Sequence, residues 1–274
     1  MGSMALPDLL VGAVQMTSTA DRQRNLDTSV RLVNEAADLG AKLVGLPENF
    51  SFMGREEERI AGAETVEGPT ISALREVARR RAIHVIAGSI PERIDAPGKT
   101  ANTSVLVASD GSVAAIYRKI HLFDVAIPDG ARYAESRTVE PGREVVAVPT
   151  AVGTLGLTVC YDLRFPELYR RLSALGAELL SIPSAFTLFT GKDHWEVLLR
   201  ARAIENLAYV LAPAQVGKHS ATRVTFGNAM IVDPWGVVLA RCPDRETVCV
   251  APVSGERLAQ VRRELPALEH RKLG

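Results

Sequence analysis

The chain has 274 residues, 47% of them hydrophobic, and its 32 lysine and arginine residues balance its 32 aspartate and glutamate residues. That length permits a sizeable buried core, and a neutral chain without a basic block gives no support for binding to nucleic acid or to a membrane surface. No stretch approaches the ~18 consecutive apolar residues of a membrane span. We therefore expect no nucleic-acid partner and no membrane partner.

The cysteine content indicates the cellular compartment of the protein, and the pattern along the chain indicates how many domains it forms. Three cysteines, Cys160, Cys242 and Cys249, are too few for a disulfide framework and suit a reducing cytoplasm. Residues 1–3 precede a second methionine and resemble an expression-tag remnant. No Pro/Ser-rich linker and no repeat of roughly 20 to 50 residues interrupts the rest. We expect a single domain over residues 4–274.

The first half of the chain alternates apolar runs of strand length with helical periodicity. Strands are expected over residues 9–16, 43–46 and 83–90. Two helices are expected between them, with apolar faces formed by Leu26, Val30, Val33 and Ala37 and then by Ile71, Leu74 and Val77. A β-hairpin is expected from 103–108 and 113–117, because Asp110-Gly111 between them tolerates the positive φ of a tight turn.

The second half continues the alternation. Further strands are expected at 155–159, 179–182, 209–212, 230–232, 237–240 and 247–253. Helices are expected at 166–175 and 194–205, with a final one marked by Leu258, Val261 and Leu265. Helices intermixed with strands and hairpins predict a mixed sheet with layered helices, which is an α/β fold class.

A reactive cysteine stands at the end of one of these strands. Cys160 directly follows the strand at 155–159 and precedes a helix that begins at Pro166. Backbone N–H groups and a helix dipole in such a turn lower a thiol pKa, so we predict a thiolate nucleophile here. A lone cysteine is also often a buried structural residue, so this hypothesis requires partners.

Two charged residues stand at the ends of other predicted strands. Glu48 follows the strand at 43–46 beside Pro47, where a partly desolvated carboxylate is a usable proton acceptor. Lys119 ends the hairpin, and an ammonium can stabilise a developing oxyanion. Each alone is typical of a solvated loop side chain. Because strand ends converge on one edge of an α/β sheet, the three residues together predict a site at that edge.

The segments around these residues resemble the signature blocks of the nitrilase, or carbon–nitrogen hydrolase, superfamily. The blocks are Leu-Pro-Glu-Asn at 46–49, Tyr-Arg-Lys-Ile-His-Leu-Phe-Asp at 117–124 and Cys-Tyr-Asp-Leu-Arg-Phe-Pro-Glu at 160–167. Flanking segments at 183–187, 191–196, 200–206 and 232–236 look like the Nit branch of that superfamily, and the likeness extends almost end to end. That branch contains the deaminated-glutathione amidases and the ω-amidases.

The resemblance implies a four-layer α-β-β-α sandwich that forms a homodimer or a higher homo-oligomer through a helical face. It implies a triad of Glu48, Lys119 and Cys160, and a second glutamate that the Glu135-Ser136 element ahead of Pro141-Gly142 would supply. It also implies hydrolysis of a small-molecule amide through a cysteine acyl-enzyme, with no metal and no organic cofactor.

The substrate expectation also comes from the resemblance. Segment 212–219 looks nearer to the deaminated-glutathione group than to the ω-amidase group. Arg164, four residues past Cys160, could pair bidentately with a substrate carboxylate, unless it forms an ion pair with Glu167. The N–H of Tyr161 would hold the oxyanion together with Lys119. The other expected substrate contacts are Phe186 and Thr187, with Lys218 and Arg223 as further candidates for the carboxylate.

Several alternatives stay open. They are an ω-amidase acting on α-ketoglutaramate, an N-carbamoyl amino acid hydrolase, an aliphatic nitrilase or amidase, and a binding protein with a decayed nitrilase fold. A papain-like enzyme is disfavoured because none of the five histidines lies in a papain-type signature. A zinc site is disfavoured because there is no His-Glu-x-x-His, and Cys242 and Cys249 are too far apart for a zinc knuckle.

Overall fold

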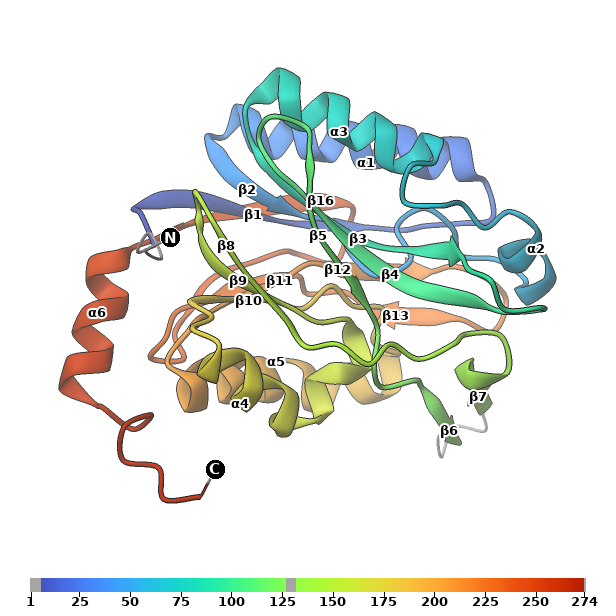
Figure 1. Cartoon of the computed structure of the whole chain (residues 1–274). Helices are drawn as coiled ribbons and strands as arrows, with labels where there is room; N and C mark the ends of the chain where they lie inside the picture. The colour runs from blue at the N-terminus through green and yellow to red at the C-terminus, as the bar shows by residue number, and fades with distance from the viewer. Residues whose placement is uncertain (1–5, 127–131, 274) are drawn as a thin grey trace.

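Two β-sheets lie face to face between two layers of helices (Figure 1). The computed structural model describes residues 6–126 and 132–273, so the tag remnant expected at 1–3 lies outside the described residues. The arrangement is a four-layer α-β-β-α sandwich, which confirms the predicted fold class. No helix in the described ranges is long and apolar enough to cross a membrane.

The first sheet has the strand order β13-β12-β1-β2-β3-β4-β5, and β16 also pairs with β1. Its strands are β1 (Leu9–Met16), β2 (Ala41–Gly45), β3 (His84–Arg93), β4 (Thr100–Val107), β5 (Val113–Arg118), β12 (Ala214–Lys218), β13 (Val224–Phe226) and β16 (Thr247–Val253). The sequence predicted all of these except β12 and β13. Both are short, and the polar and glycine residues in β12 interrupt the apolar pattern on which the prediction depends.

The second sheet has the strand order β15-β14-β11-β10-β9-β8. Its strands are β8 (Val146–Thr150), β9 (Gly153–Leu157), β10 (Leu179–Ser181), β11 (Tyr209–Ala212), β14 (Met230–Val232) and β15 (Val238–Arg241). A separate ribbon pairs β6 (Asp124–Ala126) with β7 (Arg132–Ala134). The sequence did not predict β8 or the ribbon; β8 contains Pro149, which weakens a strand signal.

The helices cover the outer faces of the sheets (Figure 1). On the first sheet lie α1 (Arg22–Asp38) and α3 (Pro69–Arg81), and on the second lie α4 (Pro166–Ala174) and α5 (Leu188–Asn206). Two further helices are α2 (Glu56–Ala61), which the sequence did not predict, and α6 (Gly255–Glu264). Short 3₁₀ turns span Glu135–Arg137 and Cys160–Arg164.

Helix α5 begins six residues before its predicted start at 194. Thr187 caps it, because its side-chain oxygen accepts a hydrogen bond from the N–H of Thr190 at 3.3 Å. Gly191 in the first turns lies against Phe226, where an added Cβ would come within 2.3 Å of that side chain. The glycine weakens the helical signal in the sequence, but it allows the close packing of α5 on β13.

Two apolar layers hold the sandwich together. One lies between the two sheets and continues beneath α4 and α5. The other lies between the first sheet and helices α1 and α3. Every residue of β4, and all but the last of β3, is buried, because these strands are covered on both faces. Polar side chains in such strands therefore need internal partners.

Two glycines allow the backbone to approach closely beside the predicted reactive residues. A Cβ at Gly88 would lie 2.0 Å from the carbonyl oxygen of Pro47, and one at Gly142 would lie 2.0 Å from that of Arg118. The N–H of Gly142 donates to the carbonyl oxygen of Lys119 at 2.8 Å. Only glycine fits at these two positions, because a Cβ would collide with the neighbouring backbone. The two close contacts fix the backbone beside Glu48 and at Lys119.

Candidate active site

The three residues predicted at strand ends lie together, although they come from two sheets. Glu48 follows β2 and Lys119 follows β5 in the first sheet, while Cys160 follows β9 in the second. The sequence suggested a site at the edge of one sheet. The structure instead places the site between the ends of two sheets. The difference arises because an apolar run in the sequence does not show to which sheet a strand belongs.

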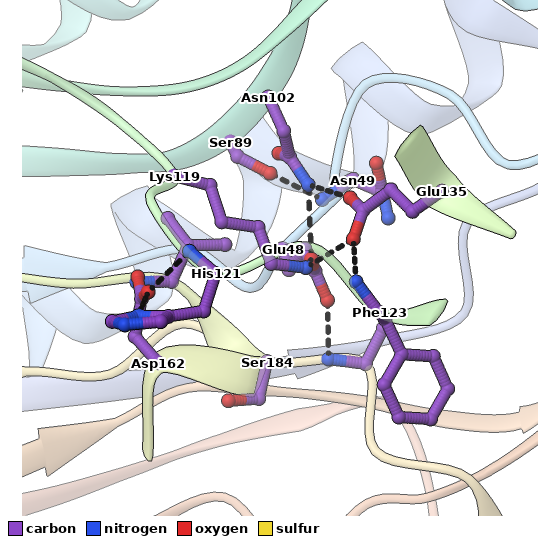
Figure 2. Close-up of polar contacts among 12 residues, drawn as sticks. Glu48, Asn49, Ser89, Asn102, Lys119, His121, Phe123, Glu135, Asp162 and Ser184 are labelled. Carbon is purple, nitrogen blue, oxygen red and sulfur yellow. Dashed lines mark hydrogen bonds and ion pairs between the residues drawn. The ribbon is translucent and has the colours of Figure 1, made fainter. Parts of the chain in front are cut away.

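The Lys119 ammonium lies between two carboxylates (Figure 2). Its Nζ is 2.9 Å from Oε1 of Glu48 and 2.8 Å from Oε2 of Glu135. Lys119 is only 2% exposed and Glu48 only 3%. Charges buried this deeply require paired and hydrogen-bonded partners. The structure thus brings together Glu48, Lys119 and Glu135, as the sequence predicted.

Neutral donors complete the coordination of the two carboxylates. The side-chain amide of Asn102, on β4, donates to Oε1 of Glu48 and to Oε1 of Glu135, both at 3.0 Å. The N–H of Ala185 donates to Oε2 of Glu48 at 3.0 Å, and the N–H of Phe123 donates to Oε2 of Glu135 at 2.7 Å. Both carboxylates are therefore held as hydrogen-bond acceptors in fixed orientations.

The mutual pairing decides the charge state of this cluster. Burial alone would lower the pKa of Lys119, but the carboxylates of Glu135 and Glu48 outweigh burial and raise the pKa above its ordinary value. Burial would raise the pKa of Glu135, but the Lys119 ammonium overrides it and the pKa falls to about 2. With both carboxylates ionised, the three side chains carry one net negative charge.

Cys160 lies in a tight turn in the left-handed region of backbone conformation, with a φ of 49°. Such a conformation is uncommon outside glycine and costs on the order of 1–3 kcal/mol. The N–H of Cys160 donates to the carbonyl oxygen of Pro183 at 2.9 Å. The hydrogen bonds of the turn begin with the N–H of Asp162, so the N–H of Tyr161 has no partner within the turn.

The prediction of a lowered thiol pKa at Cys160 was wrong. Burial raises the pKa of this thiol well above 9.0, and the adjacent Glu48 carboxylate raises it further by its charge and by a hydrogen bond. The Lys119 ammonium opposes this shift without cancelling it. A hydrogen bond from the Ala185 N–H to the sulfur also lowers this pKa, but burial, followed by the charge of Glu48, outweighs it. Cys160 therefore rests as a neutral thiol beside a carboxylate base.

Asp162 clamps the cysteine turn to the segment that carries Lys119, and sequence reasoning missed it. Its fully buried carboxylate accepts hydrogen bonds from the Tyr117 hydroxyl at 2.7 Å, the Val159 N–H at 2.8 Å and the His121 N–H at 3.1 Å. It is also 2.7 Å from Nδ1 of His121. An available signal was an acidic residue two positions after the cysteine in an otherwise apolar stretch.

A cavity of about 440 Å³ opens onto this cluster. All four residues predicted as substrate contacts line it, namely Tyr161, Arg164, Phe186 and Thr187. The alternative ion pair between Arg164 and Glu167 is absent from the described contacts. Instead, the Arg164 guanidinium lies over the Phe186 ring at 5.3 Å, and its Nη1 is 3.2 Å from Nδ1 of His194.

No three His, Cys, Asp or Glu side chains within residues 6–126 and 132–273 gather where they could hold a metal ion. Among the histidines, His84 is 5% exposed within β3, where burial lowers its pKa. His84 is therefore a packed residue of the core and does not line the cavity. Cys242 is buried far along the chain from Cys160, and its sulfur lies near the carbonyl oxygen of Ala13.

Known proteins are similar to this chain in sequence and in fold over nearly its whole length. The carbon–nitrogen hydrolase family pattern matches residues 10–263. A protein of Synechocystis named deaminated glutathione amidase is 48% identical over 265 residues, which cover 96% of this chain and 97% of that one. Among solved structures, the NitFhit protein of C. elegans is 40% identical with a TM-score of 0.93, covering 98% of this chain and 66% of that longer one. Nit3 of Saccharomyces cerevisiae, described as a member of branch 10 of the nitrilase superfamily, is 28% identical with a TM-score of 0.88 and 99% coverage of both chains.

Replacing Glu48 by glutamine should lower the pKa of Cys160. The carboxylate raises that pKa, so its loss leaves the sulfur beside Lys119 with less opposing negative charge and the thiolate forms at lower pH. The ultraviolet absorbance of the thiolate, followed through a pH titration, measures the shift. The Cys160→Ala substitution, made in the wild type and in Glu48→Gln, gives the absorbance of Cys242 and Cys249, which is subtracted. A Glu48→Gln thiol that titrates at or above the wild-type pH would refute this electrostatic assignment.

Proposed function

The chain belongs to the carbon–nitrogen hydrolase family, and we propose that it cleaves the amide bond of deaminated glutathione, or of a closely related α-keto acid amide, through a thioester on Cys160. The observation that carries this proposal is the neutral Cys160 thiol beside the buried Glu48–Lys119–Glu135 cluster at the floor of a cavity. The named relative from Synechocystis supports the choice of substrate.

In the acylation step, Glu48 removes the thiol proton as Sγ of Cys160 attacks the amide carbonyl carbon. The carbonyl π electrons move onto oxygen, and the Lys119 ammonium and the N–H of Tyr161 stabilise the oxyanion. As the carbon–nitrogen bond breaks, protonated Glu48 gives its proton to the leaving nitrogen. The products of this step are a Cys160 thioester, a free amine and an ionised Glu48.

In the deacylation step, water attacks the thioester carbon while a carboxylate of the cluster takes the water proton. The proton then returns to the departing sulfur, which releases the carboxylic acid and restores the thiol. Glu135 supports both steps because its carboxylate holds the Lys119 ammonium charged and in place. Every proton removed is returned within the cycle.

The half-buried Arg164 accounts for a preference for an acyl part that bears a carboxylate. It lines the cavity, lies against the Tyr161 and Phe186 rings, and forms no ion pair with a described carboxylate. A planar guanidinium in that position can receive a carboxylate bidentately. Phe186 and Thr187 form the adjoining wall, where the acyl chain would lie.

The free cysteines and the exposed apolar residues support two further parts of the proposal. We place the protein in the reducing cytoplasm because all three cysteines are unpaired thiols.

We also propose that it forms at least a dimer through the outer surface of α5. That surface, here called the α5 face, exposes Val197 and Ile204 of α5 together with Trp235 and Val237 of the turn that packs against Ile204. Apolar side chains gathered in this way commonly mark a protein interface.

The substrate proposal predicts an order of catalytic efficiencies. The kcat/KM for deaminated glutathione should exceed that for α-ketoglutaramate, and both should exceed that for a neutral amide of equal length. Arg164→Met should lower kcat/KM by about 10- to 100-fold for the two charged substrates. A loss of this size corresponds to the free energy of one hydrogen bond to a charged group. The loss for the neutral amide should be much smaller. A wild type that favours the neutral amide would rule out the anion site and favour a carbamoylase or a broad aliphatic amidase.

The assembly proposal predicts a mass of at least twice 29.5 kDa by light scattering at micromolar concentration. Val197→Lys should lower that mass, because a buried unpaired ammonium in the α5 face disfavours association. Leu39→Lys is the matched control, since Leu39 is an exposed apolar residue at the end of α1. A monomeric wild type, or equal effects from both substitutions, would contradict the assignment of this face.

A further inference from the structure

The cavity wall carries more positive charge than catalysis at Cys160 requires. Six cationic side chains face four carboxylates around it, and five of the six are arginines. Of these arginines, Arg132 and Arg137 are exposed at the rim, while Arg59, Arg164 and Arg223 are half-buried. None of the five pairs with a carboxylate that the structure describes. The catalytic cluster itself is net negative, so the excess positive charge belongs to the surrounding wall.

Arg59 has the least satisfied guanidinium among them. Its Nη1 donates to Oδ1 of Asn49 at 3.2 Å, but its Nε and Nη2 are enclosed and have no hydrogen-bond acceptor. Buried N–H groups of a charged side chain without an acceptor are costly and uncommon. Arg59 lines the cavity and pairs with no described carboxylate, so a carboxylate ligand at this wall would supply the counter-ion that the guanidinium lacks.

Arg59 and Arg164 line the same cavity but contact different parts of its wall. Arg164 lies against the rings of Tyr161 and Phe186, on the side of the cysteine turn. Arg59 contacts Asn49, the residue after Glu48, and is near enough to Glu135 to help lower the pKa of that carboxylate. One unpaired guanidinium thus lies beside the cysteine turn, and the other lies beside the segment that follows Glu48.

The mechanism decides which end of the substrate faces each side. Glu48 must pass its proton to the leaving nitrogen, so that nitrogen lies within hydrogen-bond reach of Glu48. The amine part of the substrate then extends towards Asn49 and Arg59, and the acyl part extends towards Arg164. A cavity of about 440 Å³ falls within the ~300–1,000 Å³ range of pockets for ligands larger than a simple amide.

We infer that Arg59 is a second anion site, which binds a carboxylate on the leaving amine while Arg164 binds the carboxylate of the acyl part. The preferred substrates are then amides of amino acids or short peptides with a free terminal carboxylate, in which the acyl part is also anionic. This inference rests on the proposed function, since deaminated glutathione has one carboxylate on its α-keto acyl part and another on its terminal glycine.

The experiment compares two substrates, deaminated glutathione and the same molecule with its terminal glycine as a carboxamide. The wild type should prefer the free acid by about 10- to 100-fold in kcat/KM, as expected for a charged hydrogen bond at this position. Arg59→Met should bring that preference close to unity. Arg164→Met should keep it, because Arg164 binds the other carboxylate. Comparing ratios removes any general effect that a substitution has on turnover.

Two further variants separate recognition from other causes. Arg59→Lys keeps the positive charge but loses the planar fork, so it should retain part of the preference. Arg80→Met removes an exposed arginine of α3 remote from the cavity and should keep the full preference. The inference is overturned if the wild type uses both substrates equally, or if Arg59→Met keeps the wild-type ratio. A wild type that cleaves neither substrate, but cleaves other amides, would instead overturn the proposed function on which it rests.

Discussion

The buried ion pairs of Lys119 with Glu48 and Glu135 are the constraint on which the rest of the site depends. Removing one member of a buried ion pair typically costs about 3–5 kcal/mol, because it leaves an uncompensated charge. The surrounding structure is arranged to satisfy all three charges. Asn102 on β4 joins the two carboxylates, and the N–H groups of Phe123 and Ala185 occupy the remaining oxygens. The close backbone contact at Gly142 fixes the position from which Lys119 extends.

Burial and the neighbouring Glu48 carboxylate together raise the pKa of the Cys160 thiol. A cysteine that rested as a thiolate here would add another negative charge to a buried site, so Cys160 keeps its proton. In the proposed mechanism, Glu48 accepts that proton only when an electrophilic carbon is present to receive the sulfur. The positive wall around the cluster has the complementary effect. Under the proposed function, it attracts anionic substrates towards a reaction centre that would otherwise repel them.

Much of the fold was readable from the sequence, because apolar runs and helical periodicity report burial directly. The elements that the sequence missed carry weaker patterns, as in β12 with Gln215 and Gly217, or in the start of α5 at Leu188. Glu48, Lys119 and Cys160 could be predicted to lie together because each follows a strand. Asn102 and Asp162 could not, since polar side chains in buried segments reveal their partners only in three dimensions. The pKa of Cys160 was misjudged for the same reason, because the sequence does not show that the Glu48 carboxylate lies beside the sulfur.

Cleavage of the amide through a thioester on Cys160 leaves a covalent intermediate that can be detected. The most direct test mixes enzyme with deaminated glutathione, quenches the reaction within the first turnover and determines the mass of the Cys160 peptide. This peptide should gain the mass of the acyl part while the amine part is already free in solution. Cys160→Ala should neither gain the mass nor release the amine. Release of the amine by Cys160→Ala at the wild-type rate, or an acyl group on Cys242 or Cys249 in place of Cys160, would contradict this mechanism.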